Sequence, residues 1–75
     1  SDKVLFGATV TISNEDGGTT TYQIVGEDEL DPPNGKISWK SPLAKVLLGK
    51  KTEDAILFQK PAGAEEIVIE KIEYK

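Results

Sequence analysis

The chain has 75 residues, with nine lysines, thirteen acidic residues and no cysteine, histidine, methionine or arginine. A chain of this length forms one compact domain. The missing cysteine and histidine exclude disulfides, thiolate or imidazole metal sites, cysteine nucleophiles and Ser-His-Asp triads. Apolar runs also stay well short of the roughly 18 to 20 residues that a membrane span needs. We therefore expect a domain without metal or other cofactor that makes no contact with a membrane.

The formal net charge of −4 argues against nucleic acid as the main ligand, because affinity for nucleic acid comes from cations that neutralise phosphates. We expect no direct sequence-specific contact with nucleic acid. The charges are unevenly distributed: residues 4–35 carry six acids and no lysine, whereas residues 36–60 carry six lysines and two acids. This split predicts one acidic and one basic surface, and the basic surface suits an acidic protein partner.

The first predicted elements form a β-hairpin. Residues 8–13 alternate between apolar and hydroxyl side chains, which is typical of a half-buried strand. The cluster NEDGG at residues 14–18 supplies turn residues that tolerate positive φ. A second strand follows at residues 19–25, with Tyr22 and Ile24 on one face.

A loop and a short strand are predicted next. The segment GEDELDPPNG at residues 26–35 contains two prolines, which donate no N–H to a sheet. After this loop, Ile37 and Trp39 alternate with polar residues and indicate a strand at residues 36–40. We expect the Trp39 indole to pack in the core in preference to a role in partner contact.

A helix of about two turns is predicted at residues 42–48. Ser41 is a good N-cap, Pro42 suits the first helical position because its missing N–H costs nothing there, and Gly49 suits the residue after the helix. The helix therefore has a defined start and end in the sequence.

Two further strands complete the prediction. The apolar run at residues 55–59 is consistent with a central strand, and residues 61–63 form a turn. In the last strand, residues 65–74, the apolar side chains change from odd to even positions, which predicts a β-bulge near Glu70 or Lys71. The resulting order is β-β-β-α-β-β, a curled antiparallel sheet around one short helix, of the α+β class.

The acidic loop and the helix are the candidates for function. The carboxylates of the loop do not follow the spacing of an EF-hand, so we interpret them as a solvated charge run. These carboxylates are Glu27, Asp28, Glu29 and Asp31. The helix has apolar residues all round, and two interpretations remain open. It is either buried nearly all round, or Leu43 caps an exposed apolar patch ringed by Lys40 and Lys45.

The sequence resembles that of the C-terminal domain of the bacterial transcript cleavage factors GreA and GreB. The resemblance rests on VLFGATVTI, YQIVGEDELD, GKISWKSPLAKVLLGK and IVIEKIEYK, and it extends from about Val4 to Tyr74. It implies an FKBP-like fold, which agrees with the order of elements predicted above. It also implies a protein that acts in transcription elongation. Independently of the resemblance, a small domain without disulfides or a secretory apolar segment is expected in the cytoplasm.

The resemblance further implies where the domain binds its partner. In this family the C-terminal domain docks on RNA polymerase, at the coiled-coil rim of the secondary channel on the largest catalytic subunit. The Ser-Pro pair at the helix start makes the contact, which implicates Ser41 and Pro42, with Lys40, Leu43 and Lys45 beside them. Position 40 holds an acid in some GreB-like members and commonly an amide in GreA-like members, so it does not assign a subtype.

Cleavage of backtracked RNA in this family needs an N-terminal helical hairpin with an acidic tip, and we expect residues 4–75 to lack it. Residues 1–3 are expected to be a leader or tag remnant, and the domain to be a monomer that is not an enzyme. A related polymerase-channel binder or inhibitor without cleavage activity is one alternative. A peptidyl-prolyl isomerase is another, suggested only by the fold, and the five aromatic residues are all expected in the core.

Overall fold

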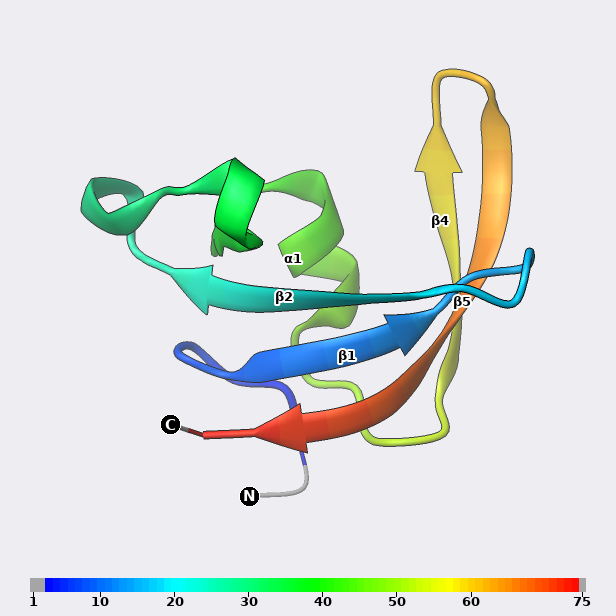
Figure 1. Ribbon diagram of the computed structural model, residues 1–75, viewed down its shortest axis with the longest axis horizontal. Helices are drawn as coiled ribbons and strands as arrows, with labels where there is room; N and C mark the ends of the chain where they lie inside the picture. Colours follow the sequence, from blue (N-terminus) through cyan, green and yellow to red (C-terminus); the bar gives the residue numbers. More distant parts are fainter. Residues whose placement is uncertain (1–2, 75) are drawn as a thin grey trace.

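The structure, a computed structural model, describes residues 3–74. In this part of the chain five strands form one sheet in the order β3-β2-β1-β5-β4, curled around one short α-helix (Figure 1). The elements are β1 (Thr9–Ser13), β2 (Thr19–Val25), the 3-10 turns η1 (Glu27–Glu29) and η2 (Pro32–Asn34), β3 (Lys36–Ser38), α1 (Pro42–Leu47), β4 (Ala55–Lys60) and β5 (Gly63–Glu73). The expected α+β class and the β-β-β-α-β-β order are confirmed.

The β1–β2 hairpin has the predicted turn. The Asn14 N–H donates to the Gly18 carbonyl at 2.8 Å, and the Gly18 N–H donates to Asp16 Oδ1 at 2.9 Å. Gly17 takes a φ of +89°, a conformation that side chains disfavour. The residue types of the cluster therefore match the positions that the turn requires.

The predicted bulge in β5 is confirmed. Thr11 pairs with Lys71, but the next residue, Ile12, pairs with Ile69, so Glu70 is the extra residue. The Ser13 hydroxyl donates to Glu70 Oε2 at 2.9 Å and holds the bulged side chain against β1. The bulge also helps β5 to bend, so that its first half pairs with β4 and its second half with β1 (Figure 1).

The third strand departs from the expectation of an antiparallel sheet. β3 runs parallel to β2, with Gln23 opposite Lys36 and Val25 opposite Ser38. Residues 26–35 carry the chain back along the sheet through η1 and η2, which is why the two strands end up in the same direction. This predicted loop therefore works as a short crossover within a mixed sheet.

The fourth strand is an edge strand, so the interpretation of residues 55–59 as a central strand is wrong. β4 pairs only with β5 in the described sheet. Its inward residues Ile56 and Phe58 pack on the core, whereas Leu57 is 62% exposed. A run of apolar residues hides this alternation because the outward positions are also apolar.

The core lies between the concave face of the sheet and α1. Ala44 and Leu47 of the helix are fully buried against the inward side chains of the strands, which include Ile24, Ile67 and Ile69. In Figure 1 the β4–β5 hairpin rises steeply away from β1 and β2, and α1 occupies the hollow of this curl. The helix is therefore covered by the sheet on its inner side and open to solvent at its N-terminal end.

The start of the described chain is fastened to its end. The Tyr74 hydroxyl donates to the Lys3 carbonyl and accepts from the Leu5 N–H at 3.0 Å. The leader expected at residues 1–3 lies outside the described residues except for Lys3, which forms a β-bridge with Lys51. Along residues 3–74 the structure contains no helix of the length and apolarity that a membrane span requires.

Candidate functional site

Three of the five residues expected to contact a partner, Lys40, Ser41 and Pro42, lie where β3 leads into α1, at residues 38–42, which we call the 38–42 turn. The other two, Leu43 and Lys45, follow in α1. Backbone hydrogen bonds fix the shape of the turn. The Trp39 N–H donates to the Val25 carbonyl at 3.0 Å, and the Ser41 N–H donates to the Ser38 carbonyl at 2.9 Å. The turn is therefore held to the end of β2 before any partner arrives.

The start of α1 is capped as predicted. Ser41 is extended, with φ −67° and ψ 152°, a conformation favoured by the proline that follows it. Its Oγ accepts from the Ala44 N–H at 3.2 Å, and Pro42 occupies the first helical turn with its ring exposed. The Ser-Pro pair thus both begins the helix and presents a rigid apolar ring to solvent.

Trp39 lies on the surface, so the expectation of core packing is wrong. Its side chain is 43% exposed. Lys40 Nζ lies 5.4 Å from the centre of the indole ring and 3.4 Å from Glu27 Oε1 in η1. The lysine is thus attracted by both the ring and the carboxylate.

The other two predicted contact residues have different environments. Leu43 is half-buried and packs against the core, whereas Lys45 is exposed on the outer face of α1. The structure therefore brings Lys40, Ser41 and Pro42 together on the surface and turns Leu43 inward. The exposed apolar area at this place comes from Trp39 and Pro42.

Sequence reasoning does not include Trp39 and Glu27 in the site. For Trp39 a signal was present, because Ser38 is a turn-former that can end β3 one residue before the tryptophan. For Glu27 no local signal exists, because its contact with Lys40 depends on how η1 packs against β3. Through Glu27 the acidic loop therefore contacts the 38–42 turn, so it is not only a solvated charge run.

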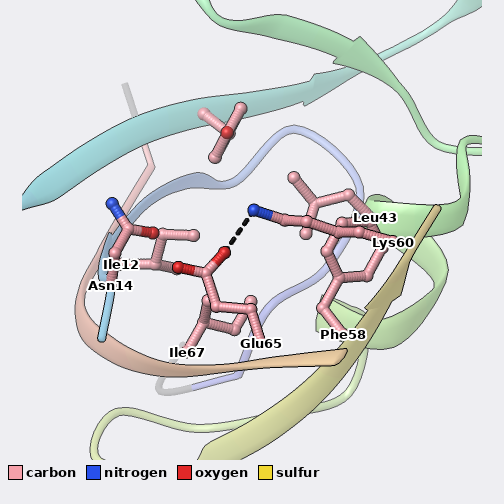
Figure 2. A pocket seen from close by; sticks show the side chains of 8 residues that line it. Ile12, Asn14, Leu43, Phe58, Lys60, Glu65 and Ile67 are labelled. Atoms are coloured by element: carbon pink, nitrogen blue, oxygen red, sulfur yellow. Dashed lines mark hydrogen bonds and ion pairs between the residues drawn. The ribbon is translucent and has the colours of Figure 1, made fainter. Parts of the chain in front are cut away.

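A second candidate is a pocket on the concave face of the sheet, which we call the concave pocket. It is lined by Ile12, Asn14, Tyr22, Leu43, Phe58, Lys60, Glu65 and Ile67. Figure 2 shows Lys60 and Glu65 reaching toward each other across it, with an ion pair between Nζ and Oε1. The cavity volume is about 30 Å³, which is room for only one or two water molecules.

The electrostatics of the concave pocket are set by this ion pair. The hydrogen bond that Lys60 donates to Glu65 raises the pKa of Lys60 above the usual value for lysine. The side chains of both residues remain accessible to water, so the pair closes the pocket without being buried. Among residues 3–74 no group of three or more acidic, histidine or cysteine side chains is placed to hold a metal ion.

Comparison with known proteins identifies the family. The model of the family described as "Transcription elongation factor, GreA/GreB, C-term" matches residues 1–74. GreA of Pseudomonas aeruginosa is 49% identical over 75 residues, covering 99% of this chain and 48% of the relative. GreB of Neisseria meningitidis serogroup B is 46% identical over 74 residues, covering 99% of this chain and 45% of the relative.

Solved structures agree with these sequence relatives. The transcription factor Gfh1 superimposes with a TM-score of 0.87 and 27% identity, over 96% of this chain and 48% of that one. A GreA/GreB elongation factor from Nitrosomonas europaea gives a TM-score of 0.82 and 27% identity, over 97% of this chain and 62% of that one. The chain spans about half the length of the curated relatives. It belongs to the GreA/GreB family of transcription elongation factors, whose C-terminal domain it matches along nearly its whole length.

Proposed function

We propose that this domain docks on bacterial RNA polymerase through the 38–42 turn, at the coiled-coil rim of the secondary channel on the largest catalytic subunit. The single observation that supports this best is the geometry of the turn. It presents Pro42, Ser41 and Lys40 on a backbone that is already fixed by hydrogen bonds. A fixed turn loses little conformational entropy on binding.

The docking proposal can be tested by titrating the isotope-labelled domain with the rim coiled-coil fragment. We expect chemical-shift changes at residues 38–45, and weaker binding by Pro42→Ala. Pro61→Ala is the matched control, because Pro61 is also an exposed proline but lies in the β4–β5 turn. Shift changes confined to β4, β5 and their turn, or equal affinities of the two variants, would contradict docking through the 38–42 turn.

We further propose that the domain acts in the cytoplasm as a monomer and leaves catalysis to other parts of the transcription machinery. In this proposal cleavage of backtracked RNA requires an additional helical hairpin of the kind found in the family's complete factors. Added in excess, the domain should then reduce cleavage stimulated by a complete factor, because both compete for the rim. Stimulation of cleavage by the isolated domain would contradict this division of labour.

A prolyl isomerase activity is not part of the proposal. Two features of the concave pocket speak against it: the small cavity volume, and the Lys60–Glu65 pair across it. Three of the five aromatic residues expected in the core are exposed instead, namely Phe6, Trp39 and Tyr74. They therefore do not line the concave pocket, where such an activity would need them.

A further inference from the structure

We propose that Trp39 is the main apolar anchor of the docking surface, and that Glu27 and Lys40 hold its indole ready for contact. This inference rests on the proposed docking function and names the residue that gives the contact its affinity and specificity. The partner group it would take is an apolar side chain on the polymerase rim.

The anchor role of Trp39 is supported first by its exposure. A tryptophan normally buries most of its surface in a small domain, yet this one is 43% exposed directly beside Ser41 and Pro42. It is not placed there by a loose loop, because its N–H donates to the buried strand residue Val25 at 3.0 Å. The indole and Pro42 are thus both exposed on one turn whose backbone is fixed by hydrogen bonds.

The anchor role is supported second by the charges of Lys40 and Glu27 beside the indole. Lys40 Nζ lies 3.4 Å from Glu27 Oε1 and 5.4 Å from the indole centre, so its charge is already offset within the domain. A lysine engaged in this way contributes little net attraction to a partner, but it restricts the indole from one side. The binding energy at this position is therefore expected from the ring and not from the cation.

Charge complementarity identifies the surroundings of the partner group. The exposed acids Asp28 and Glu29 lie in η1, which packs against β3, and exposed Lys45 lies on α1. The Glu27–Lys40 pair places η1 beside the turn, and Lys45 follows Ser41 by four residues on α1. We therefore expect a rim surface with an apolar side chain that meets the indole, a basic group that faces η1 and an acidic group that faces Lys45.

Calorimetric titration of the rim coiled-coil fragment into the folded domain tests the anchor. Trp39→Ala should raise the Kd at least about tenfold, as is usual for truncation of a tryptophan hot spot. Leu57→Ala is the matched control, because Leu57 is also an exposed large apolar residue but lies on β4. Trp39→Phe should bind with intermediate affinity, and a two-dimensional NMR spectrum of each variant confirms that it is folded.

The fluorescence of the wild-type domain gives an independent readout, because Trp39 is the only tryptophan. With a rim fragment free of tryptophan, binding should shift the emission to shorter wavelength as the indole leaves water. Glu27→Gln should change the Kd by less than about fivefold, the range of an exposed ion pair.

The outcomes separate this inference from the docking proposal. If Pro42→Ala weakens binding while Trp39→Ala binds like the wild type, docking stands and the anchor is wrong. An effect of Glu27→Gln as large as that of Trp39→Ala would also overturn it, because charge would then carry the contact. Absence of wild-type binding overturns the docking proposal and the anchor with it.

Discussion

The 38–42 turn and the concave pocket show two ways in which this small curled sheet arranges polar and apolar groups. At the turn, Trp39 and Pro42 are exposed on a backbone held by hydrogen bonds, and Lys40 is paired with Glu27. In the concave pocket, Tyr22 and Phe58 are among the lining residues. Lys60 and Glu65 form an ion pair across it (Figure 2). Apolar groups are thus presented outward at one place and enclosed at the other.

Both regions contain apolar side chains beside a lysine–glutamate pair, but the two regions use them differently because they lie at different places on the sheet. The concave face belongs to the core, so most apolar surface there is already used for folding. The 38–42 turn lies after an edge strand, where side chains contribute little to the core and remain free to bind. Recognition by this domain is therefore expected at the end of the sheet and not in its hollow.

The largest expected effect that separates the two regions comes from Gly35→Ala. Gly35 has a φ of +78°, and an added Cβ would lie 2.5 Å from the Thr21 carbonyl oxygen of β2. The backbone must shift at the start of β3, so we expect a loss of roughly 2 to 4 kcal/mol in the free energy of unfolding. Denaturant unfolding measures this loss, and hydrogen exchange should show β3 and the 38–42 turn loosened more than β4 and β5.

Gly17→Ala is the control for backbone strain alone. Gly17 has a φ of +89°, but an added Cβ would meet no atom within 4 Å. Its cost should be about 1 kcal/mol, from the positive φ. Equal losses for Gly17→Ala and Gly35→Ala would show that close packing of β3 on β2 does not matter.

A smaller effect is expected from Ser41→Ala, which removes the N-cap of α1. The Ala44 N–H loses its partner at 3.2 Å, and the free energy of unfolding should fall by about 1 kcal/mol. Ser41→Asn keeps a capping oxygen and should retain most of the stability. If Ser41→Asn is stable but binds the rim as weakly as Ser41→Ala, the hydroxyl contacts the partner; if it restores binding, the hydroxyl acts only through the cap.

Features with a local physical cause were predictable from the sequence. The change of apolar phase in the last strand locates the bulge at Glu70, because the side-chain period of a strand is fixed at two. The Ser41-Pro42 pair and Gly49 bound the helix, since capping and the first-turn proline act within a few residues. The predicted end at Leu48 differs from the observed end at Leu47 by one residue.

Features that depend on distant contacts were not predictable. The parallel pairing of β3 follows from how residues 26–35 fold back as two 3-10 turns, and no residue type requires that path. Trp39 has the same parity as Ile37, so alternation placed both in the core; β3 ends at Ser38, and only Ile37 packs there. The residues proposed for docking came from family resemblance, because surface Ser and Pro side chains have no periodic signal.

The smallest expected effect concerns the ion pair that closes the concave pocket. The hydrogen bond that Lys60 donates to Glu65 raises the pKa of Lys60, so folding favours the protonated amine. This stabilisation is fully present below the unfolded-state pKa of about 10.4 and is lost as the pH rises through the higher pKa of the folded state. Glu65→Gln should lower the pKa of Lys60, as followed by an NMR titration of its Cε resonance, and leave affinity for the rim unchanged. An unchanged pKa would show that the pair does not persist in solution, whereas weakened rim binding would mean that the concave pocket and the 38–42 turn act as one surface.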